Sequence, residues 1–423
     1  MNEKTLAFIW QNRLFDPAGL HTTQGETVQV VKTGYTNTMS GPDITDAQIR
    51  IGDILWNGNV ELHTKSSHWT LHKHHLDRAY DNIILHVVFE DDAPLSDRQG
   101  NTVPTLVIRY DTSIEDRCAR LLSQQNPHLC PAGILELSTF NSLSFTSRLT
   151  IERLQQKAAL IRQTLDATRG DWMQTFWQHL ARSFGFGKNS TPFELMAKSL
   201  PYNLIIKNSD SFATVLALLY GQAGFLISGK YKGSDSETLL QEYKFQQAKY
   251  SLSPIDHSIW KYSGTRPQNS PFVRTRQLAS LVATNATIFD RMLSCTDIEQ
   301  MESLFAIKSN NEIPPLGTDA KHLLIINLVC PFLTCYSQYT GDTNHAQLAV
   351  DILEKLPPEK NSIVAAKAKA GLSIKSAYDS QAIIQLDTEY CKPRRCIECQ
   401  IGRHYIAGKQ NGAGRKSAPQ IKK

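Results

Sequence analysis

The chain is expected to fold as an α+β protein, with a mixed α/β module first, a large α-helical domain next and a short cysteine-containing segment last. Short apolar and alternating stretches typical of strands occupy residues 1–112. Apolar residues at helical spacing dominate residues 113–385, and three cysteines with many basic residues gather in 386–423. A chain of 423 residues is long enough for two or three such domains.

The N-terminal module is predicted from a series of short elements. Residues 1–15 favour a helix and the alternating stretch 25–31 favours a strand. Asn57-Gly58 signals a two-residue turn, because a type I′ turn needs positive φ at both central positions. This turn would join a strand ending at Trp56 to a strand of residues 59–65. The apolar run 83–89 is typical of a strand buried on both faces, and 102–110 predicts a further strand.

The predicted strand after the turn carries a row of ionisable groups. Because side chains alternate along a strand, Glu61, His63 and Lys65 face one way and the apolar residues between them face the other. Asp43 precedes the incoming strand, where the hairpin could bring it close to Glu61. This polar row beside a buried face is the first candidate for a functional site.

Pro42-Asp43 followed by Glu61-x-His63 resembles the PD-(D/E)xK nuclease superfamily, in which a Pro-Asp leads one strand and an acid-x-Lys lies on the next. The resemblance implies that Asp43 and Glu61 hold Mg²⁺, which would activate water against a phosphodiester. His63 stands in place of the family's lysine, and His63 or Lys65 would orient the water or neutralise charge. An upstream glutamate often joins such sites, and Glu26 is the candidate. The alternative is an ordinary hairpin with a salt-bridged polar face.

Most of the chain also resembles an uncharacterised bacterial family, a domain-of-unknown-function group common in Bacteroidetes. This second resemblance implies no activity. The segments that carry it are residues 41–43, 58–63, 79–88 and 220–224, and 379–383 with the cysteines that follow.

A second metal hypothesis comes from a cluster of histidines between residues 63 and 86. Imidazole binds zinc and other transition metals readily, so a zinc-centred hydrolase of a small substrate is an alternative function. The segment lacks a fixed pattern such as H-E-x-x-H, and a single histidine is more often a surface or hydrogen-bonded residue. The cluster holds six of the 13 histidines: His63, His68, His72, His74, His75 and His86.

The middle of the chain is predicted to be helical, with helices at 211–220, 236–250, 274–291, 320–336, 345–355 and 362–378. Asp171 can cap the helix that follows it, and Thr191-Pro-Phe-Glu194 has the pattern of a capping box. Residues 260–276 interleave basic and aromatic side chains. These side chains either contact phosphates and stack bases or anchor a loop to the helical core.

Cys391, Cys396 and Cys399 form a Cys-x4-Cys-x2-Cys group that suits a soft structural metal. Tetrahedral zinc needs a fourth ligand, which His404 could supply locally or Cys130 from a distance. An iron–sulfur cluster on four cysteines is the other option, and three reduced thiols in a turn is the simplest interpretation.

The charge distribution and the hydropathy of the chain limit the kinds of partner that we expect it to have. Residues 391–423 contain nine Lys or Arg and one acid, in a chain of formal net charge +5. Such a tail indicates affinity for a polyanion such as DNA or RNA, or only aids solubility. No unbroken run of 18 apolar residues occurs and the N-terminus lacks the apolar core of a signal peptide, so we expect a cytoplasmic protein without a membrane span.

The leading functional hypothesis is a metal-dependent nucleic-acid phosphodiesterase, in which Asp43 and Glu61 bind Mg²⁺ and His63 and Lys65 assist. Because His63 replaces the lysine, the second hypothesis is a non-catalytic nucleic-acid-binding or scaffold protein with a nuclease-like fold. The zinc-centred hydrolase is the third.

Overall fold

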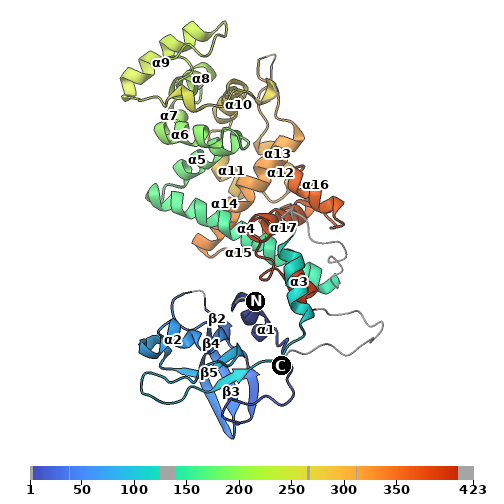
Figure 1. Ribbon diagram of the computed structural model, residues 1–423. Helices are drawn as coiled ribbons and strands as arrows, with labels where there is room; N and C mark the ends of the chain where they lie inside the picture. The colour runs from blue at the N-terminus through green and yellow to red at the C-terminus, as the bar shows by residue number, and fades with distance from the viewer. Residues whose placement is uncertain (1–2, 38, 124–138, 264–266, 311, 408–423) are drawn as a thin grey trace. The chain divides into compact units, whose positions relative to one another are not determined.

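The computed structural model describes residues 3–37, 39–123, 139–263, 267–310 and 312–407 (Figure 1). Its contacts divide the chain into two units. The sheet unit comprises the described parts of Met1–Phe145, Ala366–Leu372 and Leu386–Lys423, and the helical unit comprises Thr146–Ala365 and Ser373–Gln385. The α+β class is therefore confirmed, but the C-terminal segment groups with the sheet unit and the division falls after 145 instead of 112.

The sheet unit is built on a six-stranded mixed sheet of order β1-β3-β4-β5-β6, with β2 paired to β3. The strands β1, β3 and β4 run antiparallel, whereas β4, β5 and β6 run parallel. Helix α1 packs against β4. The bounds are α1 Glu3–Gln11, β1 Val28–Lys32, β2 Tyr35–Thr36, β3 Ile44–Ile51, β4 Ile54–Lys65, β5 Ile83–Glu90 and β6 Thr105–Val107.

The hairpin turn was predicted at the wrong place. Ile51 pairs with Ile54, so the chain turns at Gly52-Asp53, where Gly52 has a φ of 55°. Asn57-Gly58 lies inside β4. The predicted signal misled because a glycine in a strand can also serve close packing, and that is its role here.

Gly58→Ala is expected to lower the free energy of unfolding by about 1–3 kcal/mol, the usual cost of overpacking. A Cβ at Gly58 would lie 2.5 Å from Ile84 Cγ2 and 2.9 Å from Asn82 O, so β5 would have to move. Chemical denaturation measures the change. Gly317→Ala is the matched control, because nothing lies within 4 Å of its added Cβ. Equal stability of the two variants would contradict the steric argument.

A β-bulge interrupts the pairing of β3 with β4. Between Ile44 and Ala47, β3 contains one residue more than the stretch of β4 that it pairs with, and Asp46 in this bulge has a φ of 54°. Beyond the bulge, Ile44 pairs with Val60. One residue further along this register, Asp43 lies opposite Glu61. A regular ladder would set Asp43 opposite the next residue along β4, on the other face of the sheet.

The connection from β4 to β5 crosses over to join two parallel strands, as parallel pairing requires. It consists of short helical turns: α2 (His68–Leu71), η1 (His74–Leu76) and η2 (Arg78–Tyr80). Strand β5 is buried on both faces as predicted, with Ile84 to Val88 all buried. The sheet unit also contains α3 (Ser113–Leu122) and α18 (Gln400–Ala407), which are joined by a hydrogen bond from Arg117 Nε to Ile406 O.

The helical unit has one large apolar core. Figure 1 shows α5 to α8 in green packed beside α10 to α14 in yellow and orange. The bounds are α4 Thr139–Ala167, α5 Trp172–Phe184, α6 Ser190–Ser199, α7 Tyr202–Lys207, α8 Phe212–Gln222, α9 Ser236–Tyr250, α10 Pro271–Thr284, α11 Ile288–Ser294, α12 Ile298–Leu304, α13 Thr318–Leu324, α14 Cys330–Thr340, α15 Thr343–Lys355, α16 Ser362–Lys369 and α17 Ala377–Leu386. The short turns of this unit are η3 His257–Ile259, η4 Pro267–Asn269 and the π-helical turn η5 Ile325–Val329. A second π-helical turn, η6 Asp387–Cys391, belongs to the sheet unit.

Several helix predictions need correction at their ends. The helix predicted at 274–291 is interrupted between Thr284 and Ile288, and the one at 362–378 ends at Lys369. Asp171 caps α5 as predicted, since its carboxylate accepts a hydrogen bond from Gln174 N at 2.9 Å. The capping box was wrong: α6 begins one residue before Thr191, and its N-cap, Asn189, makes no side-chain capping bond.

The aromatic and basic stretch 260–276 anchors a loop. Trp260 is buried and donates from Nε1 to Ala223 O at 2.9 Å, and Tyr262 packs with Phe225 and Phe272. Trp260 is therefore not placed to stack on a base. Residues 264–266, including one of the predicted basic contacts, lie outside the described residues.

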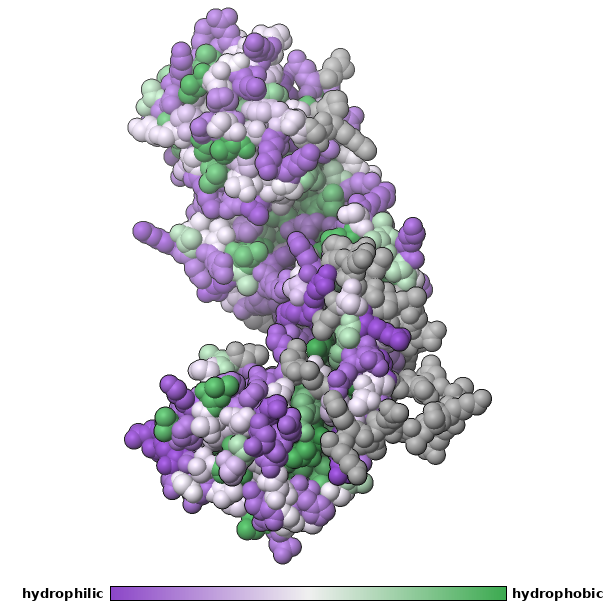
Figure 2. Space-filling view, in the orientation of Figure 1, coloured by the Kyte–Doolittle hydropathy of each residue, from purple (hydrophilic) through white to green (hydrophobic). Residues whose placement is uncertain are grey.

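The face shown in Figure 2 is largely hydrophilic, with hydrophobic residues gathered in separate patches. One helical stretch among the described residues, Thr318–Thr340, is long and apolar enough to cross a membrane by length and composition alone. Its most apolar window is 67% buried, and mostly buried core helices pass the same test.

Candidate metal centre

The two predicted acids meet. The Asp43 N–H donates to Glu61 Oε2 at 3.0 Å, and the Leu62 N–H donates to Asp43 Oδ2 at 3.2 Å. Glu61 is buried, with 4% of its surface exposed. Burial, and then the charge of Glu61, raise the pKa of Asp43 to about 7. The charge of the buried Glu61 thus disfavours ionisation of the half-buried Asp43, and a bound cation would relieve that conflict.

His63 lies at the centre of a group of imidazoles. Its Nδ1 is 2.9 Å from His86 Nε2, and its Nε2 is 3.1 Å from His72 Nδ1. The ring centroids of His68 and His74 lie 5.9 and 5.2 Å from that of His63. Burial, and then the neighbouring histidines, lower the pKa of His63 to about 2 and that of His86 to about 3. Both rings are therefore neutral near pH 7, the form of histidine that binds metals.

The imidazoles and Glu61 offer converging donor atoms. Glu61 Oε1 lies 3.2 Å from His74 Nε2 and 3.6 Å from His63 Nε2. Donor atoms of His63, His72 and His74 all lie within 4.8 Å of one another. His74 Nε2 is buried, yet it makes no hydrogen bond within the described structure. Three nitrogens and one carboxylate oxygen form a donor set that suits zinc or manganese, so these residues fit a metal ion.

A glutamate that the sequence interpretation missed borders this cluster. Glu3 on α1 lies 3.7 Å from His68 Nδ1, and donor atoms of Glu3, His68 and His72 also lie within 4.8 Å of one another. The predicted upstream acid, Glu26, is instead exposed ahead of β1, and no described contact links it to the cluster. The sequence offered one signal for Glu3, which is an acid on the first predicted helix.

Lys65, the third residue of the predicted polar row, does not join Glu61 and His63 at the histidine cluster. It is half exposed and forms ion pairs with Glu90 at 3.1 Å and Asp92 at 4.0 Å. Its position near the end of β4 explains this, because the acids at the end of β5 are its nearest partners. Tyr80, by contrast, packs on His74 with ring centroids 3.9 Å apart, and burial with the charge of Glu61 raises its pKa to about 12.

The cysteines of the C-terminal segment lie in the sheet unit. Cys391 ends η6, and Cys399 precedes α18. Burial, with neighbouring Cys391 and Cys396 among the lesser causes, raises the pKa of Cys399 to about 11. Cys391 Sγ accepts a hydrogen bond from the buried Lys367 Nζ at 3.1 Å.

Both groups of three close metal-binding atoms found among the described residues belong to the histidine cluster. The cysteine metal site therefore stays a prediction. Its proposed remote ligand, Cys130, and the last part of the basic tail, 408–423, lie outside the described residues.

Comparison with known proteins places the chain in a family. No curated protein and no solved structure matches it. A family model described as a protein of unknown function, DUF2851, matches residues 3–362, which is most of the chain and includes the whole histidine cluster. The chain therefore belongs to the DUF2851 family of proteins of unknown function.

Proposed function

We propose that this protein is a metal-dependent phosphodiesterase that acts on nucleic acid. The observation that supports the proposal is the convergence of Glu61, His63, His72 and His74, with Asp43 beside Glu61. These residues come from two neighbouring strands and their crossover connection. The buried imidazole of His63 is neutral near pH 7, and Glu61 supplies the negative charge that a divalent cation requires.

The order of these residues agrees with the nuclease resemblance in two respects and departs from it in a third. An acid leads β3 and a second acid lies on β4, as that superfamily requires. His63 takes the position of the family's lysine, but its two ring nitrogens contact other histidines. His63 is therefore better suited to bind a metal than to serve as a cationic assistant.

The donor set favours Mn²⁺ or Zn²⁺ over the Mg²⁺ expected from the acids alone. Magnesium prefers oxygen ligands, whereas imidazole nitrogen suits transition metals. When bound, the ion would polarise a phosphodiester oxygen or lower the pKa of a bound water. His63, His72, His74 and Glu61 would hold it, and Asp43 would add a carboxylate on the same face of the sheet.

Wild-type protein is expected to cleave DNA or RNA in the presence of Mn²⁺ or Zn²⁺ and to lose this activity with a chelator. Gel assays on single- and double-stranded substrates measure it. Salt-dependent binding of nucleic acid without cleavage would contradict the phosphodiesterase and support the binding or scaffold protein instead.

His72→Ala is expected to weaken Mn²⁺ or Zn²⁺ binding by at least about 10-fold, because it removes a donor that both metal-binding groups share. Isothermal titration of metal into chelator-treated protein measures the affinity. His75→Ala is the matched control, since His75 belongs to the same connection but to neither group. Equal affinities of the two variants would show that the cluster does not hold the ion.

A zinc-centred hydrolase of a small substrate is the second candidate, because three imidazoles and one carboxylate resemble the ligands of zinc hydrolases. Hydrolysis of a small ester or amide, with nucleic acid left intact, would favour it. We also propose that the C-terminal cysteines bind a structural zinc ion or an iron–sulfur cluster. We further propose that the protein is located in the cytoplasm.

A further inference from the structure

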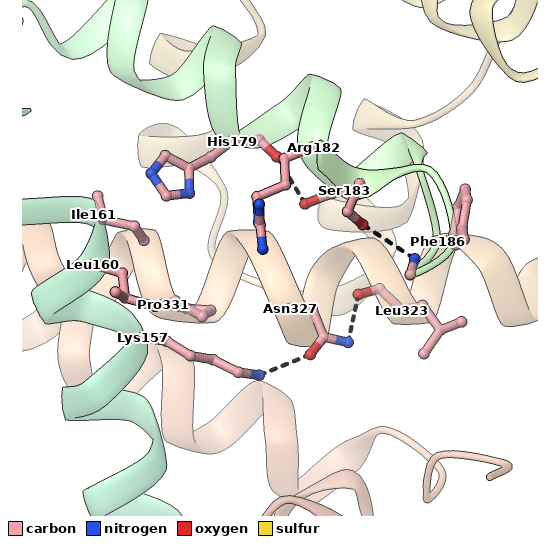
Figure 3. A pocket seen from close by; sticks show the side chains of 12 residues that line it. Lys157, Leu160, Ile161, His179, Arg182, Ser183, Phe186, Leu323, Asn327 and Pro331 are labelled. Carbon is pink, nitrogen blue, oxygen red and sulfur yellow. Dashed lines mark hydrogen bonds between the residues drawn. The ribbon is translucent and has the colours of Figure 1, made fainter. Parts of the chain in front are cut away.

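The helical unit contains a cavity of about 390 Å³ that the proposed metal centre does not use. It lies between α4, α5 and the helical stretch that runs from α13 through η5 into α14 (Figure 3). Ligand pockets in proteins commonly measure about 300–1,000 Å³, so the cavity has the size for a small organic molecule.

The titratable residues that line this cavity are all bases. Lys157 comes from α4, and His179 and Arg182 come from α5. Burial lowers the pKa of His179 to about 4, so its ring is neutral near pH 7 and Arg182 is the permanent cation. No acid is among the described lining residues. Arg182 forms an ion pair with Glu194, but Glu194 also pairs with Lys198 at 2.6 Å, so one carboxylate serves two cations and Arg182 can take a further anionic partner.

Polar contacts hold the base on α4 in place. Lys157 Nζ donates to Asn327 Oδ1 at 2.7 Å and to Gln381 Oε1 at 2.8 Å, both neutral acceptors (Figure 3). The two bonds fix the position of the amine. Burial lowers the pKa of Lys157 to about 7. Glu359 accepts hydrogen bonds from the amides of both Asn327 and Gln381. The same view shows the Arg182 side chain extending from α5 toward the helix that carries Asn327.

The remaining walls of the cavity are mainly apolar. Leu160 and Ile161 on α4, Leu323 on α13, Pro331 on α14 and the ring of Phe186 contribute them. A ligand that fills this space therefore needs a flat or compact apolar body in addition to its charge.

Two unusual backbone features present residues to the cavity. Asn327 lies on the π-helical turn η5, and such turns occur frequently at functional sites. Phe186 has a φ of 40°, a strained value for a residue with a side chain, and Arg274 lies 4.1 Å above its ring. Backbone strain of this kind gathers at ligand sites.

We propose that this cavity binds a nucleoside monophosphate, with its phosphate against Lys157 and Arg182 and its base among the apolar side chains. The planar guanidinium group of Arg182 can bind two phosphate oxygens at once. The negative phosphate would also favour the protonated form of Lys157, whose pKa burial lowers to about 7. The base supplies the flat apolar body that the walls accommodate. The site does not depend on the phosphodiesterase activity, although that reaction on nucleic acid could release such a molecule.

Isothermal titration of chelator-treated protein tests the site, because a metal at the histidine cluster then contributes nothing. AMP, GMP, CMP and UMP are the probes, with their nucleosides and inorganic phosphate for comparison. At least one nucleotide is expected to bind about 10-fold or more tightly than both its nucleoside and phosphate. Binding by none of the four, or equally tight binding of phosphate alone, would overturn the proposal.

Arg182→Gln is expected to weaken nucleotide binding by about 10-fold or more, the usual cost of losing a charge-assisted hydrogen bond. The matched control is Arg162→Gln, which removes the same charge from an exposed ion pair with Asp166 outside the cavity. Asn327→Ala offers a second lining variant at an exposed position, in case the first affects folding. Equal affinity in lining and control variants would place the ligand elsewhere.

Discussion

Glu61→Gln is expected to reduce metal-dependent cleavage by about 10³-fold or more. The substitution keeps the size of the side chain but removes the negative charge that faces His63 and His74. A neutral amide is a poor ligand for a divalent cation, and losses of this size follow when an electrostatic partner of a reaction centre is removed. Initial rates of cleavage with saturating Mn²⁺ or Zn²⁺ measure the effect.

Glu90→Gln provides the matched control for this experiment. Glu90 lies on the neighbouring strand β5, is exposed and pairs with Lys65. The same chemical change there is expected to leave cleavage within about 2-fold, because surface ion pairs contribute little. Comparable rates for Glu61→Gln and wild type would show that cleavage, if observed, takes place elsewhere or comes from a contaminant.

Asp43→Asn is expected to reduce cleavage by about 10²–10³-fold, because it removes a carboxylate charge beside Glu61 while the Asp43 N–H can still donate to Glu61 Oε2. Initial rates of cleavage with saturating Mn²⁺ or Zn²⁺ measure the loss, and the circular dichroism spectrum is expected to stay near native. Deletion of Asp46 is expected to be far milder. It removes the extra residue of the bulge, so Ile44 stays opposite Val60 and Asp43 stays opposite Glu61.

Asp46→Gly is the control, because it removes an acid that touches no member of the histidine cluster in the described contacts. Glycine adopts positive φ without strain, so this variant keeps the bulge and is expected to be as active as the wild type and at least as stable. Equal cleavage by Asp43→Asn and Asp46→Gly would refute a role for the Asp43 carboxylate.

The sequence predicted which residues gather at the candidate site better than it predicted their geometry. The motif contains Asp43, Glu61 and His63, but the predicted turn at Asn57-Gly58 would have paired Glu61 with residue 54 and left Asp43 outside the hairpin. The acids meet because the turn is five residues earlier and β3 contains a bulge before it. Gly58 instead packs closely against residues 82 and 84, and a local turn signal does not contain that contact.

Long-range contacts account for the rest of the difference. Glu3 joins the histidines through the packing of α1 on β4, a contact between segments some 60 residues apart that no local pattern encodes. Helix capping at Asp171 and the buried strand β5 were predicted correctly because local hydrogen bonding and continuous hydrophobicity determine them. The capping box failed at Thr191 because its helix starts one residue earlier.

The connection between β4 and β5 is held at its two ends, by hydrogen bonds from Ser66 and Ser67 to Asp92 and by the ion pair of Asp81 with Arg98. Its middle has fewer apolar contacts: Trp69 is its one described buried apolar residue, whereas Leu71 and Leu76 are 70% and 64% exposed. An ion bound by His72 and His74 of the connection and by His63 of β4 would therefore tie the middle of the connection to the sheet. Loss of the ion would let this connection open locally. Its backbone would then be exposed to proteases and hydrogen exchange, while the sheet stays intact.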